Sequence, residues 1–323
     1  MDTGVERDRE VLFQVSPGVT SGASSPVLSA AAPSLWRLLP LLVPFVLLFG
    51  GGLALAVAQS LGWFLPLPWP PLWAPLWEGG RFAAYLQVLT PRYAGSFVLS
   101  IGVALASALL SVAGGALLAW FVWRLPRRLG PWAVVYKIPL ILPHIAVAFI
   151  VLVFWSRSGL VAALCWHLGL IDRAAGFPSP LFNGTGLGMV MAYVYKETPF
   201  VVLLAHAALR RLDERLIQAA RMLGGSRLQI FRAVVLPHLA PVLRTTFIIL
   251  FCYTFGAFEI PYLLGESTPG MLSIEVWNLY FQRDLAERPV AMALLTLMFL
   301  FAAACIVVYA RLARRLGAGM RKL

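Results

Sequence analysis

The sequence predicts an all-α, polytopic membrane protein with six transmembrane helices. Apolar residues make up 60% and charged residues 12% of its 323 positions, against roughly 45–50% and about 25% in an ordinary soluble domain. The apolar residues gather in long blocks, each close to the roughly 20 residues with which a helix crosses a bilayer. A transmembrane barrel is excluded, because its strands alternate in polarity and do not form such blocks.

The N-terminal segment, residues 1–34, differs from the rest of the chain. It mixes charges and is then rich in Ser, Pro, Gly and Ala, a composition that favours disorder. It has no basic n-region, and the apolar run after it is too long for the core of a signal peptide. We therefore predict a disordered tail over 1–34 and a transmembrane domain over 35–323.

Six apolar blocks define the predicted spans in chain order. The first follows the tail, and a loop crowded with Pro and Trp separates it from the second. Proline at that density cannot continue a helix and Trp favours the membrane interface, so this loop is expected to lie along the outer surface. The predicted bounds are 38–60, 94–122, 132–155, 187–209, 243–265 and 289–310.

The distribution of Lys and Arg predicts the orientation. The tail, the 123–131 loop, the 210–244 loop and the C-terminal segment carry 18 of the 26 basic residues, and the three loops on the other side carry six. The positive-inside rule therefore places both termini and the 210–244 loop in the cytoplasm. The same rule accounts for the net charge of +12 without a nucleic-acid partner.

No metal, cofactor or disulfide is expected. The histidines are scattered over different elements without an H-x-x-x-H pair, and the cysteines are widely separated. These residues are His144, His167, His206 and His238, with Cys165, Cys252 and Cys305.

The longest cytoplasmic loop contains an ordered pattern, "IQAARMLGGSRLQIFRAVVLPH". Gly224 is suited to the left-handed residue that ends a first short helix. Ser226 and Gln229 form a capping box, S-x-x-Q, that starts a second. Pro237 limits how far the second helix continues, since proline lacks the N–H that the helical ladder needs. We predict two short helices joined by a hinge.

The pattern resembles the loop of the permease subunits of bacterial ATP-binding-cassette (ABC) importers, which carries E-A-A-x3-G-x9-I-x-L-P. The spacing is the same throughout, with Gln218 in place of the glutamate and Val234 in place of the isoleucine. The resemblance extends to "YKETPFVVLLAHAALRRLDERL" upstream and "FGAFEIPYLLG" downstream. It implies that the loop 210–242 couples to an ATPase subunit, through Gln218, Ala219, Ala220, Gly224, Leu236 and Pro237.

The resemblance also implies an architecture and partners. It implies the type I ABC importer permease fold, in a transport subunit of the bacterial inner membrane that is not itself an enzyme. The implied partners are an ATP-binding subunit dimer, a second permease (identical or homologous) and an extracytoplasmic substrate-binding protein. No G-x-x-x-x-G-K-[ST] phosphate loop occurs in the sequence, so another chain is expected to bind ATP. The pattern is most similar to the first permease of spermidine/putrescine importers, which suggests a polyamine-like substrate by analogy. Sulfate, iron, thiamine and phosphonate importers share much of the same pattern.

Three ionisable residues in the spans are candidates for the translocation pathway: Lys196, Glu197 and Glu259. Charges within a membrane are costly and usually functional, paired or facing water. Lys196 and Glu197 project about 100° apart on a helix, so they are not expected to pair with each other. Lining of the pathway, pairing with a neighbouring helix and, for Lys196, snorkelling all stay open.

Two other classes compete with an importer subunit. The same three charged residues would suit an ion-coupled secondary transporter, but no repeated pair of broken helices is evident in matching halves of the sequence. A membrane-embedded enzyme is disfavoured, because no nucleophile with a base, carboxylate pair or metal cluster is evident.

Overall fold

The computed structural model describes residues 35–63, 82–126, 128, 134–173, 176–266 and 268–320. Over these ranges every regular element is a helix and no strand forms. The predicted all-α fold is confirmed, and six candidate spans run Leu38–Ser60, Pro91–Trp123, His144–His167, Leu187–Leu209, Arg227–Gly256 and Leu285–Arg315. The predicted tail and most of the Pro- and Trp-rich loop lie outside the described residues.

The chain divides into two units, the first ending at Gly50. The described part of this unit is α1 (Leu35–Phe45) followed by the π-helical η1 (Val46–Gly50). Pro40 and Pro44 lie within α1, and each removes one N–H from the helical ladder. The rings of Phe45 and Phe49 stack with their centroids 5.3 Å apart.

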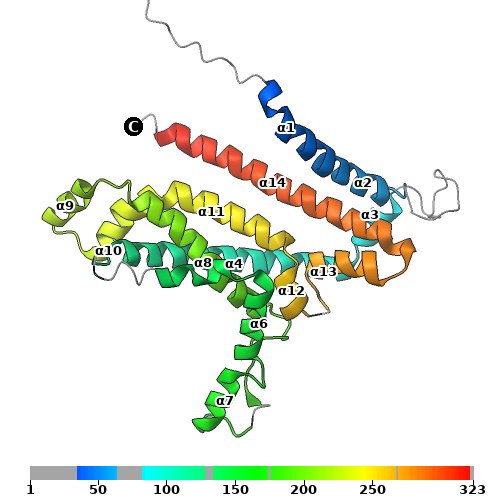
Figure 1. The fold of residues 1–323 in the computed structure, drawn as a ribbon, viewed down its shortest axis with the longest axis horizontal. Coiled ribbons are helices and arrows are strands. Elements are labelled where there is room, and N and C mark those ends of the chain that lie inside the picture. The colour runs from blue at the N-terminus through cyan, green and yellow to red at the C-terminus, as the bar shows by residue number, and fades with distance from the viewer. Residues whose placement is uncertain are drawn as a thin grey trace, which may run out of the picture. The chain divides into compact units, whose positions relative to one another are not determined.

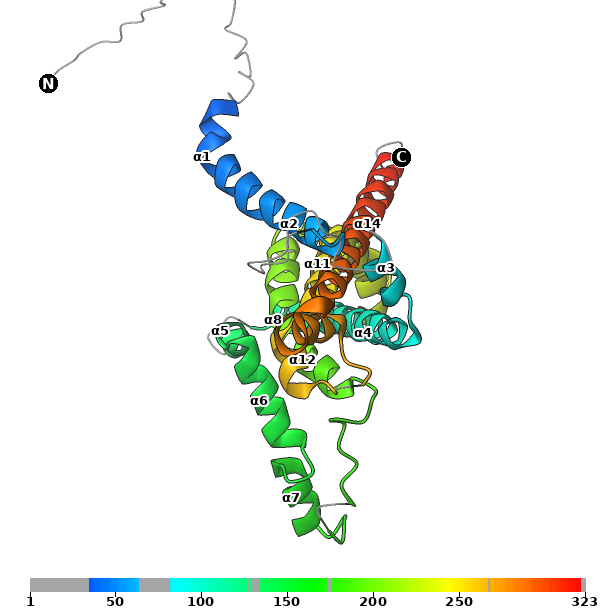
Figure 2. The same ribbon diagram turned by 90° about the vertical axis from the view of Figure 1, so that its right-hand side faces the viewer.

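The second unit holds all the other helices. In Figures 1 and 2, α4, α8 and α11 lie against one another, and α14 runs along α2 and α3. The α-helices are α2 (Gly51–Ser60), α3 (Ala83–Val88), α4 (Pro91–Trp123), α5 (Ile138–Ile141), α6 (His144–Trp155), α7 (Leu160–His167), α8 (Leu187–Leu209), α9 (Glu214–Met222), α10 (Arg227–Ile230), α11 (Leu236–Gly256), α12 (Glu259–Leu264), α13 (Leu272–Trp277) and α14 (Arg288–Met320). Shorter elements are the π-helical η4 (Phe231–Val235) and η5 (Asn278–Gln282) and the 3-10 helix η6 (Leu285–Glu287).

Small residues allow α4 and α8 to pack closely. Of the six candidate spans, α8 has the largest buried share. A Cβ atom added at Gly115 of α4 would lie 2.5 Å from Val201 Cβ and 3.1 Å from the Thr198 carbonyl oxygen, both on α8. Side chains this small let two helix backbones approach each other. The buried small residues of α4 are Ser96, Ser100, Ala104, Ser107, Ala108, Ser111, Gly115, Ala116 and Ala119.

The third predicted span, 132–155, is wrong at its start. The chain breaks between α5 and α6, where Leu142 and Pro143 both have extended backbone angles. The cause is Pro143, because a proline disfavours the helical conformation of the residue before it. Lys137 therefore precedes α5 instead of lying inside a long spanning helix.

The fifth predicted span, 243–265, is also wrong at both ends. The helix is interrupted at Ala257, before α12 begins. Pro261 explains this break, because a proline ring clashes with the carbonyl four residues earlier in a continuous helix. The Ala257 carbonyl instead accepts a hydrogen bond of 2.7 Å from the Ser273 hydroxyl.

Pro237 does not end the second short helix of the loop 210–242. Helical structure continues without interruption through α10, η4 and α11. In the π-helical turn η4, the Leu236 N–H is donated to the Phe231 carbonyl. This wider turn comes directly before Pro237, so the proline opens the next helical segment, where its missing N–H is tolerated.

We predict that the α4–α8 contact can be tested with two adjacent glycines. Gly115→Ala should lower the free energy of unfolding by about 1–3 kcal/mol, as overpacking does, because its methyl group would meet Val201. Gly114→Ala is the matched control, since nothing lies within 4 Å of a Cβ atom there. The measurement is thermal unfolding of the full chain in detergent. Equal melting temperatures for the two variants would show that the helices have room to separate.

Candidate functional site

The loop 210–242 folds as two short helices around a left-handed glycine. The Asp213 carboxylate caps α9 by accepting the Arg215 N–H at 2.9 Å. At its other end, Gly224 has φ 79°. The N–H groups of Gly224 and Gly225 are donated to the carbonyls of Arg221 at 2.9 Å and Ala220 at 3.0 Å, which is a Schellman motif. The predicted left-handed conformation of Gly224 is confirmed.

The predicted capping box of the second helix is also confirmed. The Ser226 N–H is donated to the Gln229 side chain at 2.7 Å, and the Gln229 N–H to the Ser226 hydroxyl at 3.4 Å. Two isoleucines that the sequence analysis did not single out, Ile217 and Ile230, anchor the loop in the hydrophobic core.

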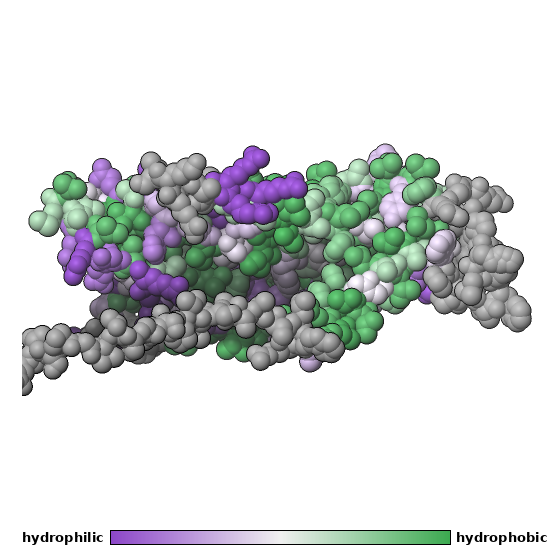
Figure 3. Space-filling model, turned by 90° about the horizontal axis from the view of Figure 1, so that it is seen from above, coloured by the Kyte–Doolittle hydropathy of each residue, from purple (hydrophilic) through white to green (hydrophobic). Residues whose placement is uncertain are grey.

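Most of the predicted coupling residues lie on the exposed side of this loop. Gln218, Ala219 and Gly224 are exposed, and Ala220 is half-buried. Leu236 and Pro237 are exposed at the base of α11. Beyond the predicted residues, Met222 and Leu223 are 89% and 88% exposed, so the end of α9 presents a large apolar surface. Figure 3 shows hydrophilic side chains gathered toward the end of the molecule that carries α9.

A basic cluster borders this surface. The Arg124 guanidinium lies over the Trp120 ring, with its central carbon 3.7 Å from the ring centroid. Burial lowers the pKa of Arg124, and the positive charges of Arg221 and Arg227 lower it further. The Arg124 guanidinium is therefore within range of the charges of Arg221 and Arg227, where the end of α4 meets the loop.

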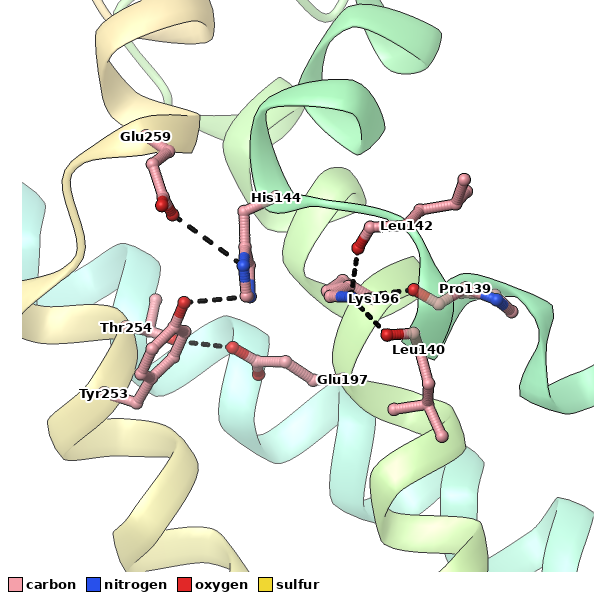
Figure 4. A network of polar contacts seen from close by, with 9 residues as sticks. All are labelled: Pro139, Leu140, Leu142, His144, Lys196, Glu197, Tyr253, Thr254 and Glu259. Atoms are coloured by element: carbon pink, nitrogen blue, oxygen red, sulfur yellow. Dashed lines mark hydrogen bonds and ion pairs between the residues drawn. The ribbon is translucent and has the colours of Figure 1, made fainter.

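The second candidate group of residues lies where α8 meets the two helix breaks (Figure 4). Lys196 is 8% exposed. Its Nζ donates to the carbonyls of Pro139 at 2.8 Å, Leu140 at 3.1 Å and Leu142. These carbonyls lie at the end of α5, where the helix leaves them without partners and a cation is favourable. Lys196 therefore caps the break between α5 and α6.

Glu197 points to a different neighbour. It is 4% exposed, and its Oε1 accepts a hydrogen bond of 2.8 Å from the Thr254 hydroxyl, in the last turn of α11. In the described part of the chain, its Oε2 and the Tyr193 hydroxyl one turn earlier are buried without a hydrogen-bond partner. As expected from their angular separation, Lys196 and Glu197 form no ion pair with each other.

Glu259 is the third predicted pathway residue, and it opens α12 after the second break. Its side chain is 54% exposed, and its Oε2 lies 3.7 Å from His144 Nδ1. The other ring nitrogen of His144 lies 2.8 Å from the Tyr253 hydroxyl. His144, at the start of α6, therefore links the two sides of the α11–α12 break (Figure 4). Sequence analysis did not assign His144, Tyr253 and Thr254 to this site, because their contacts join segments that are far apart in the chain.

The polar side chains of this network mainly hold the two helix breaks in place through hydrogen bonds. Among the described residues, no group of three or more His, Cys, Asp or Glu side chains could hold a metal ion. The ammonium of Lys196 is fully engaged by backbone carbonyls. The carboxylates of Glu197 and Glu259 keep unused acceptor capacity, so they are the groups available to a cation.

Comparisons with known proteins identify the class of protein. A family model described as "Binding-protein-dependent transport system inner membrane component" matches residues 111–322. The inner membrane ABC transporter permease protein YdcU of Escherichia coli is 27% identical over 299 residues, which cover 83% of this chain and 91% of YdcU. The spermidine/putrescine transport system permease protein PotB of the same organism is 27% identical over 182 residues, covering 56% of this chain and 64% of PotB.

The fold comparison agrees. A solved bacterial ABC transporter involved in the import of the acidic polysaccharide alginate has a TM-score of 0.69 and 21% sequence identity, covering 87% of this chain and 94% of that chain. The importer permease fold predicted from the sequence is confirmed. The chain belongs to the family of binding-protein-dependent transport system inner membrane components. It is a multi-pass permease subunit of a bacterial ABC importer, and the interpretation as a secondary transporter has no support.

We predict different outcomes for substitutions at the two adjacent charged residues of α8. Lys196→Met leaves buried carbonyls at the α5 break without a donor, and each such group costs about 1–3 kcal/mol, so the melting temperature should fall clearly. Glu197→Gln keeps an oxygen that accepts from Thr254, so its melting temperature should change little. Thermal unfolding of the purified full chain in detergent measures both. Comparable losses in the two variants would mean that Glu197 forms an ion pair, and would contradict the network described above.

Proposed function

We propose that this permease subunit takes up a polyamine-like solute and is driven by a separate ATP-binding dimer through the loop 210–242. In the proposal, residues 1–34 are a cytoplasmic tail, 35–323 form the transmembrane domain and both termini are cytoplasmic. A second permease completes the pathway, and an extracytoplasmic binding protein delivers the substrate. The observation that carries the coupling half of the proposal is the exposed apolar end of α9 on an anchored, well-capped loop.

In the proposal, the loop transmits motion because it is connected firmly to both α8 and α11. On one side it follows α8, and on the other it runs through α10 and η4 into α11 without a break in the helix. Ile217 and Ile230 fix it to the core. The His238 ring nitrogen lies 3.0 Å from the Ala208 carbonyl oxygen, which joins the first turn of α11 to the last turn of α8. A displacement of α9 would therefore move α8 and α11 together.

Those two helices also carry the polar network, which lies at the middle of α8 and at the far end of α11. Lys196 and Glu197 lie on α8, and Tyr253 and Thr254 lie in the last turns of α11. In the proposal, motion of α8 and α11 changes the access of solute to Glu197 and Glu259. Lys196 holds the α5–α6 break in place, so its role in the pathway is positional.

The substrate half of the proposal rests on similarity. PotB, a relative, is named for spermidine and putrescine transport. Two carboxylates with unused acceptor capacity, Glu197 and Glu259, are compatible with a cationic amine. The alginate transporter shares the fold at 21% identity, so its acidic substrate is no argument about this one.

The experiment is uptake of radiolabelled spermidine by membrane vesicles that contain the complete importer, with and without internal ATP. ATP-dependent uptake that unlabelled putrescine inhibits, and sulfate or thiamine does not, is the expected result. ATP-dependent uptake of one of the latter solutes alone would contradict the polyamine assignment. Spermidine uptake driven by an ion gradient without ATP would contradict the proposed coupling.

Gly224 gives a matched pair of variants for the coupling. Gly224→Val forces a β-branched residue into the left-handed region, at a cost of about 1–2 kcal/mol. If that strain destabilises the complex in which the loop is docked on the ATP-binding subunit, uptake should fall roughly five- to thirtyfold. Gly224→Asn is the control, because asparagine tolerates this conformation and nothing lies within 4 Å of a Cβ atom at this position. Equal uptake by the two variants would argue against a coupling role for the loop.

A further inference from the structure

We propose that the surface of the ATP-binding subunit that receives α9 is acidic around an apolar pocket, so that charge attraction as well as apolar burial holds the two chains together. This inference rests on the proposed function, since it concerns the same loop. It adds the chemistry of the partner, which the coupling role by itself does not specify.

Charge is distributed unevenly along the loop. Its two acidic residues, Asp213 and Glu214, lie at the start of α9, where Asp213 is already used as the N-cap. No Asp or Glu follows until Glu259. Between Glu214 and Pro237, four exposed arginines follow one another: Arg215, Arg221, Arg227 and Arg232. The exposed end of the loop is therefore cationic.

The arginines nearest the hinge lack counter-charges. Within the part of the chain that the structure describes, no carboxylate forms an ion pair with Arg124, Arg221 or Arg227. Arg124 stacks on Trp120, whose ring centroid lies 5.7 Å from that of Phe231 in the loop, and the charges of Arg221 and Arg227 act on it there. Like charges held together by packing repel one another. An acidic partner surface relieves that repulsion and supplies electrostatic complementarity.

The apolar part of the surface lies beside the cationic part. Met222 and Leu223 follow Arg221 directly and are almost fully exposed. A projecting apolar tip with a charged rim is the arrangement of a protein interface, in which apolar contacts form the core and polar groups the rim. An anionic lipid surface would also attract the arginines, but it would repel Asp213 and Glu214 at the other end of the same helix. A protein surface can match both ends.

Gln218 supports the same conclusion. It is exposed on α9, one helical turn before Arg221 and Met222. Its side chain is neutral. Beyond its first turn, α9 therefore presents no negative charge to the partner. A glutamate at this position would meet an acidic surface at close range.

The test compares two substitutions of opposite charge at one exposed position. The full permease, co-expressed with its ATP-binding subunit, is purified in detergent, and the affinity of the two chains is measured at low and high NaCl. Gln218→Glu should weaken binding about fivefold at low salt, while Gln218→Lys should preserve or strengthen it. The difference should shrink near 1 M salt, where the Debye length is about 3 Å. Tighter binding of the glutamate variant than of the lysine variant overturns the inference.

Two further variants separate this inference from the proposed function. Met222→Asp removes the apolar tip at a site so exposed that folding should be unaffected, and it should abolish binding whatever the partner's charge. If Met222→Asp still binds, the docking of α9 itself is wrong. Arg314→Glu, at an exposed arginine of α14 outside the loop, is the charge-reversal control and should bind normally. If the Gln218 variants differ only in binding to phosphatidylglycerol vesicles, the cationic surface belongs to lipid and the inference fails.

Discussion

The close approach of α4 to α8 is the constraint on which the rest of the structure depends. Gly115 leaves room for Val201, and small buried serines and alanines recur along α4. Because this contact fixes the rotation of α8, it also fixes where adjacent polar side chains point. Lys196 reaches the carbonyls of the α5–α6 break, while Glu197 reaches Thr254 beside the α11–α12 break. One rigid helix thereby holds both breaks.

The breaks lie beside the middle of α8 and the end of α11, and the loop 210–242 joins the end of α8 to the start of α11. α8 and α11 connect the polar network to the loop, where His238 and Ala208 bring them together again. Because α8 and α11 run from the loop to the polar network, they give a physical route by which motion of α9 could reach Glu197. This arrangement also explains why the polar residues of α8 need not form ion pairs, since their partners are backbone carbonyls and a hydroxyl.

The sequence was sufficient where a local rule determined the structure. The apolar blocks located the spans, Gly224 adopted the left-handed conformation, and Ser226 with Gln229 capped α10. The sequence was insufficient at prolines, because a proline can either break a helix or be accommodated within it. Pro261 broke the fifth span four residues ahead of itself, whereas a π-helical turn accommodated Pro237. The partners of Lys196 and Glu197 come from segments more than 50 residues away, and helical periodicity carries no information on such contacts.

The central claim is that the exposed end of α9 docks on an ATP-binding subunit, and photo-cross-linking from Met222 tests it most directly. A benzophenone amino acid in place of Met222 would be irradiated in native membranes, and the adduct identified by mass spectrometry. The account predicts an adduct with a chain that contains the phosphate loop missing from this sequence. Leu300, an exposed apolar residue of α14, is the control position and should give lipid adducts alone. Lipid adducts alone from Met222 as well would contradict the account.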